Sequence, residues 1–162
     1  MFDLTGKRAV ITGAANGIGK AIAELYLERG AKIVATDINS DELAAAFADA
    51  PDVITVVGDI SNDATQTTIV ETAESALGGL DILVNNAGIV IAGEFDTLTD
   101  DQWDQIMGVN VRAVFRLTRE AVPMLKASGR GRVINLGSIM SDVAGPGLAI
   151  YGTSKHAVAG LT

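Results

Sequence analysis

Residues 8–19 have the sequence RAVITGAANGIG, in which a short apolar run ends in a glycine-rich turn. The run at 8–12 contains three β-branched residues and is typical of a strand. Beyond the turn, apolar residues recur at helical spacing through residue 29, and Gly30 follows as a stop signal. The segment predicts a strand, a tight turn and a helix in direct succession, the opening unit of a fold that alternates strands and helices.

The same alternation continues along the chain. Further strands are expected at 32–37, 54–58, 81–85 and 132–136. Helices are expected at 39–49, where Asn39 and Glu42 resemble a capping box, at 62–77, from Thr99 along an apolar stripe that reaches 125, and from Tyr151 onward. We predict an α/β fold, a Rossmann-like doubly wound parallel sheet with strand order 3-2-1-4-5, in a single domain over residues 1–162.

Charge and composition narrow the function classes. The net charge of −8 argues against a nucleic-acid binder, because phosphate backbones require clustered Lys and Arg. No apolar run approaches the ~20 residues that span a bilayer, and residues 1–7 lack the pattern of a signal peptide. The absence of cysteine is compatible with a reducing cytosol. We expect a cytoplasmic protein without membrane or nucleic-acid partners.

The glycine-rich turn predicts a dinucleotide site. A strand that passes through Gly13, Gly17 and Gly19 into a helix aims backbone N–H groups and the positive helix end at a pyrophosphate. Two alternatives are a plain tight turn and a triphosphate loop, but for the latter the Gly13 to Gly19 spacing is one residue too long and Ala21 replaces the magnesium-binding Ser or Thr. Asp37 lies where the carboxylate of a dinucleotide fold accepts a hydrogen bond from the ribose hydroxyl and would repel a 2′-phosphate. We therefore expect NAD over NADP.

Three motifs together resemble the short-chain dehydrogenase/reductase family. They are TGxxxGIG at 12–19, NNAG at 85–88 and YxxxK at 151–155, and the resemblance extends over essentially the whole chain. It implies an NAD(P)-binding Rossmann domain. The cofactor-binding residues that it implies are Gly13, Asn16, Gly17, Ile18, Gly19, Asp37, Asp59, Ile60, Asn86, Ala87, Gly88, Tyr151 and Lys155. For Asp59, a cap before the following helix is the alternative to cofactor contact.

The catalytic residues expected are Asn110, Ser138, Tyr151 and Lys155. Tyr151 and Lys155 are one helical turn apart, so their side chains share a helix face. A neighbouring cation favours the phenolate, and a phenolate can remove an alcohol proton as hydride leaves the carbon. The resemblance assigns Ser138 to the substrate oxygen and Asn110 to a water that links Lys155 to solvent. His156 lies off the tyrosine's face without a Cys or acid cluster, so we expect a surface or interface residue and no metal site.

The resulting hypothesis is an NAD-dependent oxidoreductase that interconverts a secondary alcohol and a ketone, with Tyr151 as acid and base. The resemblance also implies a homo-oligomer, a tetramer or dimer, built partly from the helices that hold Asn110 and Tyr151. The alternatives are a catalytically inactive NAD-binding fragment or redox-sensing module, and a sugar-nucleotide epimerase. Sugars, polyols, hydroxyacyl thioesters and steroids all remain open as substrates.

The doubly wound pattern and the resemblance both imply more strands beyond Lys155. We therefore expect the C-terminal strands to be missing from this chain, together with part of the wall around the nicotinamide and the substrate. The expected consequence is weak or no turnover by the 162-residue chain itself.

Overall fold

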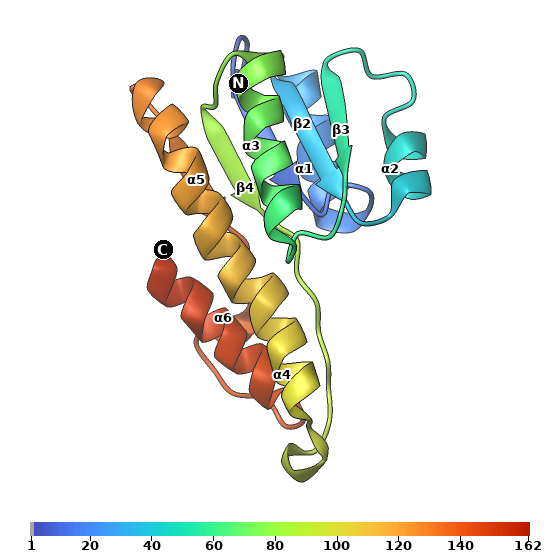
Figure 1. The fold of residues 1–162 in the computed structure, drawn as a ribbon, viewed down its shortest axis with the longest axis vertical. Helices are drawn as coiled ribbons and strands as arrows, with labels where there is room; N and C mark the ends of the chain where they lie inside the picture. Colours follow the sequence, from blue (N-terminus) through green and yellow to red (C-terminus); the bar gives the residue numbers. More distant parts are fainter. Residues whose placement is uncertain (1) are drawn as a thin grey trace.

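The computed structural model describes residues 2–162, in which a five-stranded sheet has the order β3-β2-β1-β4-β5 (Figure 1). The predicted α/β class and strand order are confirmed. The strands are β1 (Arg8–Thr12), β2 (Lys32–Asp37), β3 (Val53–Val57), β4 (Ile82–Asn85) and β5 (Arg132–Asn135). All neighbouring pairs are parallel, so the connection between one strand and the next crosses back to the amino end of the sheet.

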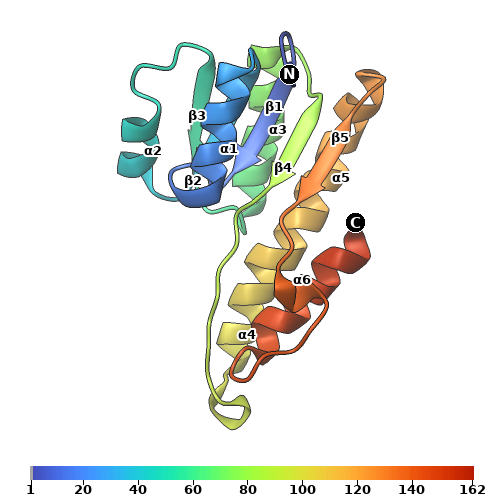
Figure 2. The same ribbon diagram turned by 180° about the vertical axis from the view of Figure 1, so that it is seen from behind.

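Helices occupy most of these crossovers. The α-helices are α1 (Gly17–Glu28), α2 (Ser40–Ala46), α3 (Asp63–Leu77), α4 (Asp100–Met107), α5 (Ala113–Ala127) and α6 (Ala149–Leu161). Two short 3-10 helices, η1 (Phe95–Thr97) and η3 (Ile139–Ser141), and a π-helix, η2 (Gly108–Arg112), complete the order. Helices α1 and α2 cover one face of the sheet, and α3 and α5 cover the other (Figures 1 and 2).

The core has two apolar layers because the sheet is covered on both faces. Successive side chains of β1 point to opposite faces, so Ala9 and Ile11 pack under α1 while Val10 packs under α3 and α5. All three residues are at most 1% exposed. Burial on both faces explains why β1 has a continuous apolar run and no polar alternation.

Side-chain caps begin three of the α-helices in the described part of the chain. Asn62 accepts a hydrogen bond from Ala64 N, and Thr99 with Gln102 forms a reciprocal capping box, as their positions in the sequence predict. The box expected at Asn39 forms only in part. Asn39 accepts from Glu42 N, but the Glu42 carboxylate turns away from Asn39 and accepts from Asn16 Nδ2 at 2.7 Å.

The largest difference from the expected boundaries lies in the long helix. The apolar stripe predicts one regular helix, but the chain forms α4, the π-helix η2 and then α5. Helix α2 ends at Ala46 instead of 49, because Phe47 leaves the helical conformation and its ring enters the core at 7% exposure. The last helix begins at Ala149, two residues before Tyr151. The remaining ends agree with the predicted ones to within two residues.

The molecule extends beyond the carboxyl ends of its strands. Helices α4 and α6 and the segment at 86–99 lie in this part, toward which the strand arrows point (Figure 2). Chemistry in open parallel sheets is found at this edge. Among residues 2–162, no helix combines the length and apolar character that crossing a membrane demands.

Candidate functional site

The glycine-rich turn after β1 depends on backbone shapes that a side chain would prevent. Gly13 and Gly17 have φ angles of 65° and 54°, in the left-handed region that favours glycine. Gly19 lies in the first turn of α1, where an added Cβ would stand 2.0 Å from Gly13 O and 2.4 Å from Asn86 Nδ2. The glycines therefore bring three chain segments into direct backbone contact.

The turn is joined to the end of β4 by hydrogen bonds. The Thr12 hydroxyl oxygen accepts from Asn86 N and Ala87 N, each at 3.0 Å. Asn86 Nδ2 donates to Thr12 O at 2.9 Å and Gly13 O at 3.0 Å. Thr12 is 2% exposed, so its hydroxyl acts inside the fold. These bonds fix the NNAG segment beside the glycine-rich turn. At this point the chain leaves β1 toward β2 on one side of the sheet and leaves β4 toward β5 on the other.

A cavity of about 530 Å³ opens at this point, along the carboxyl ends of the strands. It is lined by most of the predicted cofactor residues, namely Gly13, Asn16, Gly17, Ile18, Asp37, Asp59, Ile60, Asn86, Ala87 and Gly88. Gly19, Tyr151 and Lys155 do not line it. Asp37, Asp59 and Asp104 are the charged residues of the lining, so residues 2–162 contribute no Lys or Arg to the cavity wall.

The cavity also contains a buried polar group that the protein leaves unused. Thr36 lines the cavity and is 2% exposed, and its Oγ1 has no hydrogen-bond partner among the described residues. A buried hydroxyl without a partner costs free energy unless a ligand or water satisfies it. With the backbone contacts around Gly19 and the acid at Asp37, this wall fits the adenosine and pyrophosphate of a dinucleotide.

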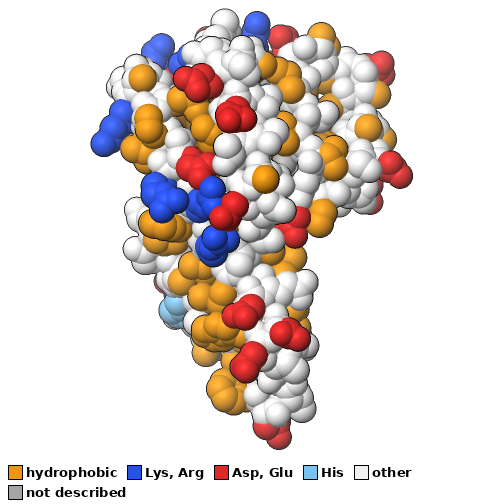
Figure 3. Space-filling model, viewed as in Figure 1, with side chains coloured by type: hydrophobic (Ala, Val, Ile, Leu, Met, Phe, Trp, Pro, Cys, Tyr) orange, Lys and Arg blue, Asp and Glu red, His pale blue; other side chains and the backbone are white. Residues whose placement is uncertain are grey.

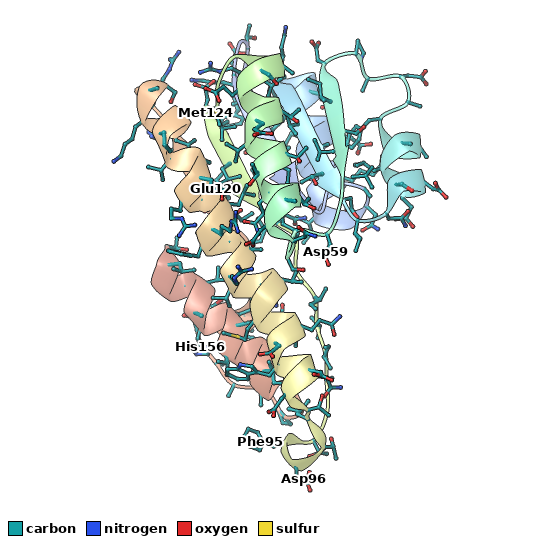
Figure 4. The ribbon with its side chains drawn as sticks, in the orientation of Figure 1. Asp59, Phe95, Asp96, Glu120, Met124 and His156 are labelled. Carbon is teal, nitrogen blue, oxygen red and sulfur yellow. The ribbon has the colours of Figure 1, made fainter. Side chains whose placement is uncertain are left out.

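The two predicted cofactor acids are held by the local backbone. Asp37 Oδ2 accepts from Ala15 N at 3.0 Å, so this carboxylate also shapes the glycine-rich turn. Asp59 lies just beyond β3 (Figure 4) and accepts from both the N–H and the hydroxyl of Ser61 at 2.8 Å. Each carboxylate is therefore oriented, and each lines the cavity.

Lys155 is buried, with 7% of its surface exposed. Its Nζ donates to Leu136 O at 2.7 Å and lies 5.8 Å from the centroid of the Tyr151 ring. Burial lowers the pKa of the Lys155 ammonium, because desolvation disfavours the charged form. The predicted proximity of Tyr151 and Lys155 on one helix face is present, and the backbone after β5 supplies the third partner.

Asn110 lies in the π-helix η2 and is 1% exposed. Its side chain pairs with both polar backbone groups of Ile89: Oδ1 accepts from Ile89 N and Nδ2 donates to Ile89 O, each at 2.9 Å. Nδ2 also donates to Ser154 Oγ at 3.0 Å, and Ser154 donates to Tyr151 O at 2.7 Å. In this structure the Asn110 amide joins the end of the NNAG segment to the helix of Tyr151.

Ser138 lies between β5 and η3, and η3 packs against α6. Its backbone N–H donates to Ser141 Oγ, and its own hydroxyl oxygen accepts from Met140 N, both at 3.1 Å. The hydroxyl hydrogen remains available as a donor. The fold thus brings Ser138 to the helix that carries Tyr151.

Gly88 connects the cavity to these residues. It lines the cavity, and an added Cβ there would stand 3.3 Å from Asn110 Oδ1 and 3.8 Å from Lys155 Nζ. His156 stands apart from this arrangement. It is exposed on α6 (Figure 4), and its Nδ1 lies 2.9 Å from Gly152 O, one turn earlier in the same helix.

Several residues of the site carry no signal in the sequence. Thr36, Glu42 and Ser154 enter through contacts between segments that are distant in the chain. Thr12 belongs to the TGxxxGIG motif, but the motif alone does not indicate that its hydroxyl holds Asn86 and Ala87. The periodicity of α4 and α5 likewise gives no sign of the π-helix between them.

Comparison with known proteins identifies the family. The sequence model for short chain dehydrogenase matches residues 7–162. The 3beta-hydroxysteroid dehydrogenase 2 of Eggerthella lenta is 42% identical, over 98% of this chain and 64% of that protein. The curated relatives are matched over 63% to 66% of their own length.

Solved structures agree with this assignment. A short chain dehydrogenase/reductase of Burkholderia phymatum, in complex with NAD, superposes with a TM-score of 0.94 at 34% identity, over 99% of this chain and 59% of that one. A gluconate 5-dehydrogenase of Burkholderia cenocepacia, in complex with NADP and tartrate, has a TM-score of 0.89 at 36% identity, over 99% and 64%. The resemblance that the three motifs predict is confirmed: the chain belongs to the short-chain dehydrogenase family.

Proposed function

We propose that this protein is an NAD-dependent oxidoreductase that interconverts a secondary alcohol and a ketone. The observation that carries the proposal is the position of Gly88, which lines the cavity at the glycine-rich turn and lies close to Asn110 and Lys155. A cofactor laid along the cavity toward Gly88 would reach the helix that carries Tyr151. The substrate itself stays open, since the relatives include steroid and gluconate dehydrogenases.

The choice of NAD rests on the charge of the cavity wall. The charged lining residues are all aspartates, and Asp37 is oriented by Ala15 N at the end of β2. A carboxylate there accepts from ribose hydroxyls and repels a 2′-phosphate. One similar protein was crystallised with NAD and another with NADP, so family membership leaves the choice to the residues of each chain.

The chemistry assigned to the chain's own residues is proton transfer and orientation. Bound NAD supplies the acceptor for the hydride that leaves the alcohol carbon. Tyr151 takes the alcohol proton as a phenolate, or donates it to the ketone oxygen in the reverse direction. Lys155 favours the phenolate by its charge. The Ser138 hydroxyl donates to the substrate oxygen where negative charge develops. Asn110 holds the segment at Gly88 in position through Ile89.

The first prediction concerns Tyr151→Phe. We expect this change to lower turnover by at least about a hundredfold, the usual contribution of a general acid and base, while the dissociation constant for NAD changes by less than about twofold. Calorimetry with NAD and the absorbance of the reduced cofactor during oxidation of a panel of secondary alcohols measure the two effects. The unaltered protein and Tyr151→Phe are compared at the same chain length, so the ratio of their turnover rates does not depend on how fast either one is.

Two matched controls accompany that variant. Tyr26→Phe removes the chain's other phenol from the core, and we expect turnover to remain within about twofold. Gly19→Ala places a Cβ against Gly13 O and should weaken NAD binding at least about tenfold, whereas Gly160→Ala, with open space around it, should not. NAD binding without turnover in the unaltered protein would favour the alternative of an inactive NAD-binding fragment or redox-sensing module. Unchanged turnover in Tyr151→Phe would refute the proposed chemistry.

A further inference from the structure

Four hydrogen bonds join the glycine-rich turn to the start of α2 in a closed ring. Asp37 accepts from Ala15 N at 3.0 Å through Oδ2 and from Asn39 N at 3.1 Å through Oδ1. Asn39 Oδ1 accepts from Glu42 N at 3.2 Å, and Glu42 Oε2 accepts from Asn16 Nδ2 at 2.7 Å. Since Ala15 and Asn16 are consecutive, the bonds form a closed ring, and two of its members, Asn16 and Asp37, line the cavity.

Two residues give up their usual local roles to close this ring. Asn16 is the N-cap residue of α1, yet its side chain makes no capping hydrogen bond and reaches Glu42 instead. Glu42 occupies the third position of α2, from which a capping-box side chain returns to the N-cap N–H. Here that N–H, of Asn39, donates to Asp37. The cross-link therefore fixes the Glu42 carboxylate on Asn16, a residue that lines the cavity.

The corner of the cavity at Asp37, with Glu42 held just outside the lining by its hydrogen bond from Asn16, has uncompensated negative charge. Neither carboxylate forms an ion pair with any Lys or Arg in the described part of the chain. The cavity lining contains no cation. A ribose hydroxyl can donate a hydrogen bond into such a corner, while a phosphate dianion in the same place is repelled by both charges.

We propose that Glu42 is a second selectivity residue, which acts with Asp37 to exclude a 2′-phosphorylated dinucleotide. The inference rests on the proposed use of NAD and adds to it a residue on a different element. Asp37 faces the cavity directly and also shapes the turn, whereas Glu42 contributes charge from α2 and is held in place by Asn16. A purely structural role for Glu42, at the positive end of α2, would affect stability and leave selectivity unchanged.

The test measures dissociation constants for NAD and NADP by calorimetry in the full chain and in Glu42→Gln. Glutamine keeps an amide oxygen for Asn16 Nδ2 and removes only the charge. We expect the ratio of the NADP constant to the NAD constant to fall about threefold to tenfold, with the NAD constant changed by less than about twofold. Raising the salt concentration toward ~1 M should shrink this effect, because it screens exposed charges.

Two further variants separate charge from position. Glu74→Gln makes the same charge change in the last turn of α3. This turn lies at the opposite end of the sheet from the cavity, since the next residue, Gly78, accepts a hydrogen bond from Arg8 at the start of β1. We expect Glu74→Gln to leave the ratio unchanged. Asn16→Ala releases the Glu42 side chain and should lower the ratio by less than Glu42→Gln does. The double variant should match Glu42→Gln alone, since both changes act through one interaction.

The outcomes distinguish the two proposals. A ratio in Glu42→Gln equal to that of Glu74→Gln, or a change that high salt does not reduce, overturns the role of Glu42 and leaves the NAD proposal intact. Failure of the unaltered protein to bind either cofactor overturns both. An unchanged ratio together with a lower melting temperature would assign Glu42 to the stability of α2 alone.

Discussion

Lys155 is the residue whose environment departs furthest from the ordinary behaviour of its type. Lysines are almost never buried without a partner. Here the ammonium is removed from water, donates a hydrogen bond to the Leu136 carbonyl oxygen and lies near the Tyr151 ring. The cost of this burial is offset elsewhere in the fold. The buried position of Lys155 places a cation beside the Tyr151 phenol, where a positive charge favours the phenolate.

The lowered pKa of Lys155 predicts a pH dependence of stability. Between the lowered folded value and the ordinary value of 10.5, the unfolded chain holds the lysine proton and the folded chain does not. Stability therefore rises with pH across this window. We expect the unfolding free energy of the unaltered protein, minus that of Lys155→Met, to increase toward pH 10.5, by at most about 1.4 kcal/mol per pH unit.

Urea unfolding at a series of pH values from neutral to alkaline measures this difference. Methionine fills a similar volume and does not titrate, so the subtraction removes the contributions of the titrating groups that lie away from Lys155. A difference that stays flat or falls with increasing pH would show that the Lys155 proton is not destabilised by the fold.

At the scale of elements, an ion pair joins the amino ends of β1 and β4, far from the cavity. Arg8 Nε donates to Asp81 Oδ2 at 2.9 Å, Arg8 N donates to the same oxygen at 3.0 Å, and Arg8 Nη1 donates to Gly78 O at 2.7 Å. Burial alone would raise the pKa of the Asp81 carboxyl, but the hydrogen bonds from Arg8 outweigh it and hold this pKa below its usual value.

The pair predicts an acid-sensitive contribution to stability. We expect Asp81→Asn to cost about 2–4 kcal/mol at neutral pH, because it leaves the Arg8 guanidinium without its charge partner. The depressed pKa means that this contribution is fully present above the ordinary value of 3.8 and is lost as pH falls through the folded value. Urea unfolding of both forms between neutral and acidic pH measures it.

The exposed Asp49 provides the control, since Asp49→Asn should change stability by less than about 0.5 kcal/mol. A cost for Asp81→Asn that persists unchanged well below pH 3.8 would rule out the charge as its origin.

Most elements of the fold could be predicted from the sequence because each carries its own local signal. The central strands β1, β2 and β4 are apolar runs buried on both faces, and Asn62 and Thr99 cap their helices where the sequence indicates. The π-helix at Gly108–Arg112 could not be predicted, because an apolar stripe records which face is buried and not how many residues fill one turn. Its formation is linked to the buried Asn110 side chain, whose partners Ile89 and Ser154 lie far away in the sequence.

The site was predictable to the extent that it consists of motifs. The residues predicted from TGxxxGIG, NNAG and YxxxK lie around one cavity and on one helix. Tertiary contacts could not be read in the same way. The bond from Lys155 to the Leu136 carbonyl and the bond from Asn16 to Glu42 depend on how crossovers bring separate loops together, and no spacing in the chain encodes them.

At the scale of the whole molecule, apolar side chains remain on the outer face of the helices. Phe115 on α5 is 50% exposed and Trp103 on α4 is 43% exposed. Apolar surface gathers over α5 and α6, below a cluster of charged side chains (Figure 3). Phe115 also contacts the guanidinium of Arg119 at 5.4 Å from the ring centroid. Exposed aromatic and Arg side chains of this kind are enriched at protein interfaces.

This surface supports the expectation of a homo-oligomer. We expect light scattering after size-exclusion chromatography to give a dimer or tetramer mass for the unaltered protein, and Phe115→Glu to shift it toward the monomer, because the change replaces an aromatic contact with a charge that the interface would have to desolvate. Phe2→Glu, at another exposed aromatic residue, should leave the mass unchanged. A monomer mass for the unaltered protein, or an equal shift in both variants, would contradict this assignment.

The hydrogen bond from Ala15 N to Asp37 has a practical meaning for anyone who wishes to re-engineer coenzyme preference. Replacing Asp37 with a small or basic residue removes the repulsion of a 2′-phosphate. The same change removes the acceptor that holds Ala15 N in the glycine-rich turn. Glu42 lies one contact further out and anchors no main-chain amide of that loop. A redesign that begins at Glu42 and keeps an oxygen acceptor at residue 37 therefore changes the selectivity between the two coenzymes and leaves the glycine-rich turn intact.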